Sequence, residues 1–210
     1  MSDAPATVYV IDDDPSVREA IQSLLLSVGL RVELFASVQE FLVTGRDAGP
    51  ACLVLDIRLP GRSGLDFQDD LARAGVQLPV IFVSGHGDVQ MSVRAMKAGA
   101  LEFLIKPFRD QDLLDAIQAA LVRDRAALEE GKALADLRRC AAKLTVRERE
   151  VMRYVVSGCS NKQIASALGL SEVTIKTHRG QLMRKMHAQS VAGLVRMADR
   201  LERSSTRFRD

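Results

Sequence analysis

Residues 52–56 read CLVLD, a run of four apolar residues that ends in Asp56. Short apolar runs of this kind are typical of strands that are buried on both faces of a parallel sheet. Similar runs occur along the first 105 residues, and most of them also lead into a polar or charged side chain. The predicted strands are Val8–Ile11, Arg31–Phe35, Cys52–Leu55, Val80–Val83 and Glu102–Ile105.

Helical patterns follow these strands. Asp14 and Pro15 suit the N-cap and the first position of a helix whose apolar residues begin at Val17. Strand and helix alternate five times, which predicts an α/β domain with a doubly wound, five-stranded parallel sheet of the flavodoxin-like kind, covered by helices on both faces. The remaining predicted helices are marked by Phe41–Leu42, Leu65–Leu71, Val89–Ala98 and Leu113–Leu121.

The polar residues after these strands form one predicted site. Strand ends of a parallel sheet meet at the ligand-binding edge, so Asp12, Asp13, Asp56, Ser84 and Lys106 should converge there. Three converging carboxylates would repel each other, and a divalent cation that prefers oxygen ligands, such as Mg²⁺, would relieve that repulsion. This collection suits phosphoryl transfer to a carboxylate, with Asp56 as the nucleophile.

The charge of the chain is divided unevenly. The formal net charge is +2, but residues 1–121 carry 10 Lys and Arg against 17 Asp and Glu, a net charge of −7. Residues 142–210 carry 14 against 6, a net charge of +8, and residues 122–141 are nearly neutral. An acidic half and a basic half indicate two domains with different partners, and the basic half points toward nucleic acid.

The second half contains only helical patterns. Thr145 with Glu148, and Ser160 with Gln163, each form a predicted capping box. Ser171 can cap a third helix that runs to about Met186, and its basic residues lie opposite an apolar stripe. Two helices joined by a short turn, with the second one basic and exposed, predict a helix-turn-helix. A fourth helix is expected from Ser190 to about Leu201.

The sequence resembles two-component response regulators of the FixJ/NarL type, closest in pattern to FixJ. The receiver resemblance rests on VIDDD (10–14), LVLDIRLPGRSG (53–64), VSGHGD (83–88) and FLIKPF (103–108). By this resemblance Asp56 is the phosphoacceptor, and Asp12, Asp13, Asp56 and the backbone carbonyl of Arg58 hold Mg²⁺ or Mn²⁺. It also implies that Ser84, Phe103 and Lys106 are the phosphoryl-sensing and switch residues, with Ser84 where Thr is commoner.

The basic half resembles the LuxR type of helix-turn-helix through LTVREREV (144–151), GCSNKQIASALGLSEVTIKTHRGQLMRKM (158–186) and SVAGLVRMA (190–198). The resemblance places Lys176, Thr177 and Gly180 on the groove-facing surface of the recognition helix. Gly180 departs from the larger residue that is often found there, so Arg179 and Gln181 are expected to supply base contacts instead. The expected phosphate contacts are Asn161, Lys162, Arg184 and the amide groups capped by Ser171.

The resemblances imply a transcription factor rather than an enzyme. A histidine kinase would phosphorylate Asp56, the receiver would form a homodimer, and the dimer would bind promoter DNA and work with RNA polymerase. Two alternatives remain: a DNA-binding regulator whose receiver acts without phosphorylation, and an aspartyl-phosphate phosphotransferase. Whether the unphosphorylated receiver masks the DNA-binding helices also stays open.

The expected organisation is a receiver domain at 5–121, a helical linker at 122–141, a DNA-binding domain at 142–202 and a frayed tail at 203–210. The chain lacks a signal-peptide pattern and any apolar run long enough to cross a membrane, so a cytoplasmic location is expected. Cys52, Cys140 and Cys159 fit neither a disulfide framework nor a zinc site.

Overall fold

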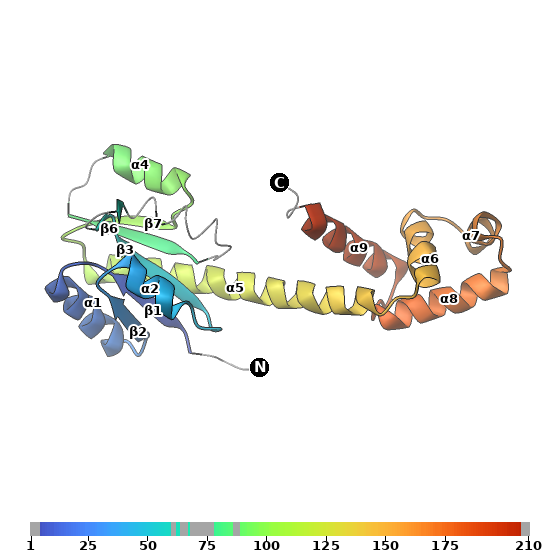
Figure 1. Cartoon of the computed structure of the whole chain (residues 1–210), viewed down its shortest axis with the longest axis horizontal. Helices are drawn as coiled ribbons and strands as arrows, with labels where there is room; N and C mark the ends of the chain where they lie inside the picture. Colours follow the sequence, from blue (N-terminus) through green and yellow to red (C-terminus); the bar gives the residue numbers. More distant parts are fainter. Residues whose placement is uncertain (1–4, 60–61, 64–66, 68–77, 86–88, 207–210) are drawn as a thin grey trace. The chain divides into compact units, whose positions relative to one another are not determined.

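The chain folds as two compact units, residues 1–128 and 129–210. The computed structural model describes residues 5–59, 62–63, 67, 78–85 and 89–206 (Figure 1). Among these residues, every helix is too short or too polar to pass through a lipid bilayer.

The first unit is built on a five-stranded sheet with the order β2-β1-β3-β6-β7, and every pairing in it is parallel. In the central strand β3, Val54 pairs with Val10 on one side and with Ile81 on the other. This confirms the predicted sheet, and each strand lies within one residue of its expected bounds. The strands are β1 (Thr7–Ile11), β2 (Arg31–Phe35), β3 (Ala51–Asp56), β6 (Val80–Ser84) and β7 (Glu102–Ile105).

Helices cover both faces of this sheet, because successive side chains of each strand point to opposite faces. Val8 and Val10 pack in one apolar cluster with α1 and α5, whereas Tyr9 and Ile11 pack in the other cluster with α2 and α4 (Figure 1). The helix expected over Leu65–Leu71 lies outside the described residues apart from Phe67, which is fully buried. The helices are α1 (Pro15–Ser27), α2 (Val38–Thr44), α4 (Val89–Lys97) and α5 (Asp110–Ala142).

A small antiparallel hairpin follows β3 and was not predicted from the sequence. It consists of β4 (Arg58–Leu59) and β5 (Arg62–Ser63), and Arg58 pairs with Ser63. Strands of two residues are too short to show any periodicity, so this element carries no signal that sequence patterns can detect. The hairpin begins two residues after Asp56 and therefore forms part of the surroundings of that carboxylate.

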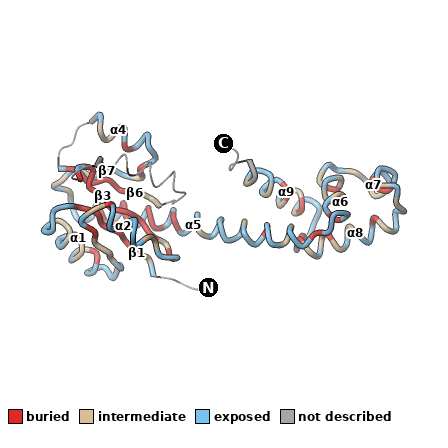
Figure 2. The backbone as a smooth tube through the Cα atoms, in the orientation of Figure 1, coloured by how far each residue is buried: buried red, intermediate tan, exposed pale blue. Residues whose placement is uncertain are grey.

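Helix α5 continues without a break through residues 122–141, the segment expected to be a helical linker. Most of that segment is exposed (Figure 2), but Asp124 is only 3% exposed. Its carboxylate accepts bonds from Arg46 Nη2 at 2.7 Å, Arg46 Nη1 at 3.2 Å and the backbone N–H of Ala51 at 2.8 Å. The Ala51 hydrogen bond attaches α5 to the first residue of β3, and the bidentate pair attaches it to the segment that precedes that strand.

The second unit is helical, and it has its own apolar core, which includes Leu137, Val151, Ile175 and Leu194. Both predicted capping boxes are present, and Gly169 adopts the left-handed conformation that ends α7 (φ 66°, ψ 35°). The helices are α6 (Val146–Val156), α7 (Asn161–Leu168), α8 (Glu172–Lys185) and α9 (Val191–Thr206).

Helix α9 is longer than the sequence indicated. We expected it to end near Leu201 and residues 203–210 to fray, but it runs to Thr206. The Ser204 hydroxyl donates to the Leu201 carbonyl at 2.7 Å, and Arg138 donates to the Ser204 carbonyl at 3.4 Å. These bonds hold the last turn, where no apolar periodicity marks the helix.

Replacement of Asp124 by Ala should destabilise the first unit by about 3 kcal/mol, because it leaves a poorly solvated guanidinium and the Ala51 amide without their carboxylate. Asp136→Ala is the matched control, since Asp136 lies on the same helix in an exposed pair with Arg139. Urea unfolding, monitored by hydrogen exchange of peptides from β3 and α5, measures the difference in the free energy of unfolding. Equal stabilities of the two variants would contradict the prediction.

Candidate phosphoacceptor pocket and nucleic-acid interface

The sheet edge brings the predicted carboxylates together. Asp12 and Asp13 follow β1, and Asp56 ends the neighbouring strand β3. Asp12 and Asp56 are buried, Asp13 is exposed, and one carboxylate oxygen from each residue lies within 4.8 Å of the others. Because a Mg²⁺ octahedron with bonds near 2.1 Å places its oxygens up to about 4.2 Å apart, this donor set fits Mg²⁺ with a small closure.

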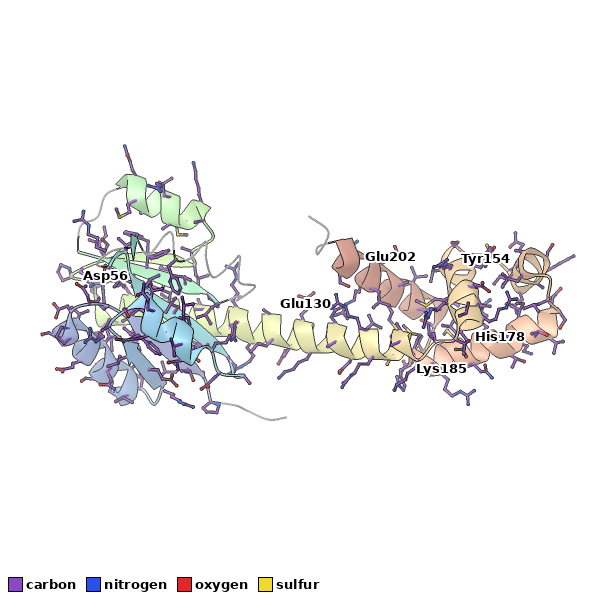
Figure 3. The ribbon with its side chains drawn as sticks, viewed as in Figure 1. Asp56, Glu130, Tyr154, His178, Lys185 and Glu202 are labelled. Carbon is purple, nitrogen blue, oxygen red and sulfur yellow. The ribbon has the colours of Figure 1, made fainter. Side chains whose placement is uncertain are left out.

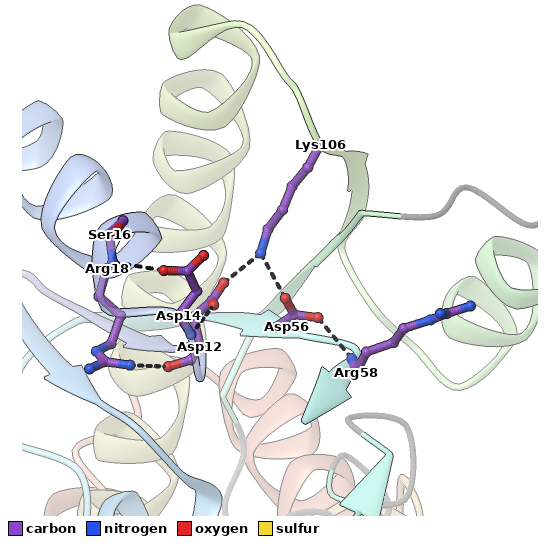
Figure 4. Close-up of polar contacts among 7 residues, drawn as sticks. All are labelled: Asp12, Asp14, Ser16, Arg18, Asp56, Arg58 and Lys106. Carbon is purple, nitrogen blue, oxygen red and sulfur yellow. Dashed lines mark hydrogen bonds and ion pairs between the residues drawn. The ribbon is translucent and has the colours of Figure 1, made fainter. Parts of the chain in front are cut away.

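Lys106 lies between the two buried carboxylates (Figure 4). Its Nζ donates to Asp12 Oδ2 at 2.6 Å and to Asp56 Oδ2 at 2.7 Å. Burial lowers the pKa of Lys106, but its bonds to the two aspartates outweigh burial and hold the pKa above the usual value. Burial raises the pKa of Asp12 above its usual value, although Lys106 and the Asp14 amide oppose this effect. The ammonium group is therefore kept charged inside the pocket.

Further hydrogen bonds orient the Asp56 carboxylate and hold the backbone around the pocket. The Arg58 N–H donates to Asp56 Oδ1 at 2.8 Å, whereas the Arg58 side chain points away from the pocket (Figure 4). Asp14 accepts a bond from the Ser16 amide and caps α1, as its position predicted. Arg18 donates to the Asp12 carbonyl at 2.6 Å, a contact that sequence reasoning missed because Arg18 follows no pattern of its own.

The two predicted switch residues lie on adjacent strands beside the pocket. Ser84 ends β6, is fully buried, and its carbonyl accepts the Lys106 N–H at 2.8 Å. Phe103 lies on β7 opposite Phe82 and packs against the apolar cluster under α2 and α4. Pocket and switch positions are thus linked through β6 and β7. The peptide bond between Lys106 and Pro107 is cis.

In the second unit, α7 and α8 form the predicted helix-turn-helix. Ser171 caps α8, accepting from the Thr174 amide at 3.1 Å, and its hydroxyl also contacts the Thr174 hydroxyl. Arg179 Nη1 donates to Asn161 Oδ1 at 2.7 Å, so two residues expected to contact DNA bind each other and join the two helices. The other candidates differ in exposure: Lys162, Lys176, Thr177, Gly180 and Arg184 are exposed, and Gln181 is half-buried.

A buried carboxylate holds the C-terminal end of the recognition helix, α8. Glu148 belongs to the capping box of α6, and it accepts a bond from Lys185 Nζ at 2.7 Å. Lys185 lies near the end of α8 (Figure 3). Burial raises the pKa of Glu148, but bonds from Lys185 and Thr145 outweigh it and hold the pKa below the usual value. The capping role of Glu148 was predicted from the sequence, but its ion pair with Lys185 was not, because the two residues are 37 positions apart.

Both units match known protein families. Residues 8–118 match the response regulator receiver domain, and residues 142–198 match the LuxR family of bacterial regulatory proteins. The chain is 50% identical to nodulation protein W of Bradyrhizobium diazoefficiens over 93% of its own length and 86% of that protein.

Solved structures give the same result. The response regulator StyR is 44% identical, with a TM-score of 0.84 over 93% of this chain and 99% of that one. Full-length FixJ from B. japonicum is 38% identical, with a TM-score of 0.56 over 93% and 97%. The chain therefore belongs to the response regulators that join a receiver domain to a LuxR-type DNA-binding domain, and it is a transcriptional regulator of that family.

Glu148→Gln should reduce the stability of the second unit by about 1 kcal/mol at pH 7, because Gln keeps the cap but loses the charge opposite Lys185. The folded-state pKa of Glu148 is depressed, so its stabilisation is complete above the unfolded pKa and is lost as the pH falls through the folded one. Urea unfolding should therefore give a difference from wild type that shrinks below about pH 4.3.

Glu150→Gln is the control for this measurement, because Glu150 forms a more exposed pair with Arg147. Its effect on the free energy of unfolding should stay below about 0.5 kcal/mol, both at pH 7 and below about pH 4.3. A Glu148→Gln effect that did not depend on pH would show that the carboxylate charge contributes nothing to stability.

Proposed function

We propose that a histidine kinase phosphorylates Asp56 in a Mg²⁺-dependent reaction, and that the phosphorylated receiver forms a homodimer that binds promoter DNA. The observation that carries this proposal is the Lys106 ammonium group, which contacts both Asp12 and Asp56 in a pocket with three converging carboxylates. Mn²⁺ is expected to replace Mg²⁺, since both prefer oxygen ligands.

The transfer needs an ionised, oriented carboxylate. An oxygen of Asp56 forms a bond to phosphorus while the bond between phosphorus and the kinase imidazole nitrogen breaks, and the imidazole leaves with the electron pair. The Arg58 amide and Lys106 hold the two Asp56 oxygens, and Lys106 can pass its bond to a phosphoryl oxygen. When bound by Asp12, Asp13, Asp56 and the Arg58 carbonyl, the metal ion neutralises charge on the phosphoryl group.

The acyl phosphate, which has a charge of about −2 in place of the −1 of the Asp56 carboxylate, would favour one of two receiver conformations. Ser84 would bond a phosphoryl oxygen and Phe103 would turn inward, which would rearrange the face formed by α4, β7 and α5. Large apolar side chains are exposed on α4 and β7 of that face, namely those of Val93, Met96 and Ile105. Exposed apolar side chains on neighbouring elements are typical of a contact surface, which supports dimerisation through this face.

A two-fold dimer would read an inverted repeat with half-sites about one helical turn apart. Lys176, Thr177 and Gly180 would face the major groove. Lys162 and Arg184, which are exposed cations, would contact phosphates together with the α8 amides at Ser171. Asn161 and Arg179 would fix the two helices against each other, and Gln181 would remain a base contact. RNA polymerase would be the partner of the DNA-bound dimer.

Incubation with acetyl phosphate and Mg²⁺, followed by intact mass measurement, tests the phosphorylation step. The wild-type chain should retain one phosphoryl group, and Asp56→Asn should retain none because an amide oxygen is a poor nucleophile. Asp47→Asn is the control, since Asp47 is an exposed carboxylate paired with Arg31 away from the pocket. Turnover without a retained group would indicate a phosphotransferase, and no reaction would indicate a phosphorylation-independent regulator.

Met96→Glu should abolish phosphorylation-dependent dimerisation and leave acetyl phosphate uptake unchanged, because it places a charge in the proposed interface but outside the pocket. Val43→Glu is the control: Val43 is 89% exposed on α2, which does not belong to that face. Sedimentation of the phosphorylated variants measures the dimer. A phosphorylated Met96→Glu protein that still dimerised would exclude the α4 face.

A further inference from the structure

The exposed face of the recognition helix contains a residue to which neither the family resemblance nor the basic pattern assigns a role. Val173, Lys176, Thr177 and Gly180 are spaced three, four and seven residues apart, so they lie on one face of α8. All four are exposed, and the Val173 side chain is 76% exposed although it is apolar. Val173 lies in the first turn of the helix, and the N-terminal residues of a recognition helix contact base edges.

Thr177 extends the apolar character of this face. Its hydroxyl donates to the Val173 carbonyl at 3.1 Å, one helical turn earlier. The hydroxyl hydrogen is therefore used within the helix, so Thr177 adds a methyl group and a hydroxyl acceptor to the exposed face. Val173 and Thr177 lie four residues apart, and both side chains are branched at Cβ. Together they present methyl groups on the first two turns of α8.

Val173, Lys176, Thr177 and Gly180 form an exposed stripe along α8. The other residues of this stripe supply few hydrogen-bond donors to base edges. Gly180 has no side chain, and a Cβ placed there would meet nothing within 4 Å, so the face is left open at this position. Arg179, the cation next to it in sequence, is bound to Asn161. Lys176 is thus the one charged side chain among these four exposed residues.

We propose that Val173, supported by the Thr177 methyl group, determines specificity by contacting the C5-methyl group of a thymine in the major groove. Thymine is the base that presents a methyl group there, and apolar side chains recognise it by contact. Double-stranded DNA suits this face better than an apolar protein surface, because the unit carries a net charge of +8 and Lys176 lies inside the stripe. This inference rests on the proposed DNA-binding function and concerns the base that one residue reads.

The test begins with selection of binding sites from randomised duplexes by the phosphorylated full-length chain. Wild-type protein should select a thymine at one fixed position of each half-site, and Val173→Ala should lose the preference at that position alone. Replacement of that thymine by uracil removes only the methyl group. Uracil should weaken wild-type binding about three- to fivefold per half-site, from roughly 0.8 kcal/mol for one buried methyl group, and should leave Val173→Ala binding almost unchanged.

Val146→Ala is the matched control, because Val146 is a 70% exposed valine at the start of α6, outside the stripe. It should select the wild-type site and show the wild-type uracil penalty. The inference is overturned if Val173→Ala keeps the thymine preference or the same penalty. If wild-type protein selects no site at all, the proposed DNA-binding function fails, and the inference fails with it.

Discussion

One ammonium group in contact with two buried carboxylates is the interaction on which the first unit depends. Asp12 and Asp56 end neighbouring parallel strands, so the sheet that brings them together also forces their charges into proximity. Without Lys106 that edge would hold two poorly solvated anions, which costs several kcal/mol per ion. Lys106 follows the end of β7, two strands away from β3, so the pocket is complete only when β1, β3, β6 and β7 lie side by side. The sheet that defines the fold of the first unit therefore also assembles the site.

Strand β3 joins this pocket to the helix that leaves the receiver. It carries Asp56 at one end, and at the other its first amide donates to Asp124 of α5. A fully buried strand with partners on both sides moves as a rigid element. Asp56 and the partner of Asp124 thus lie at opposite ends of one strand. The bidentate Arg46 contact holds α5 at that point, and further along the same helix Leu137 belongs to the core of the second unit.

The sequence predicted the parts that repeat a strong local pattern. Buried strands, the Asp14 cap and both capping boxes each have a residue signature within a few positions, and all were found. The pocket was predicted because parallel topology brings strand ends together without any further information. Pairings between distant residues were not predicted: Arg46 and Asp124 are 78 positions apart, and Glu148 and Lys185 are 37 apart. Nothing local marks such partners, since each residue alone resembles an ordinary surface charge.

The division of charge constrains how phosphorylation could act on DNA binding. Phosphorylation would replace the −1 carboxylate of Asp56 by an acyl phosphate of about −2, which makes residues 1–121 more negative than their present −7. Activation by direct attraction of the receiver to DNA is therefore excluded by sign. Screening also limits the field of the receiver to about 8 Å at physiological ionic strength. Activation must therefore act through geometry. In the proposed dimer, two +8 units would place two recognition helices on one duplex, where the second binding event would become intramolecular and would gain affinity without any new contact.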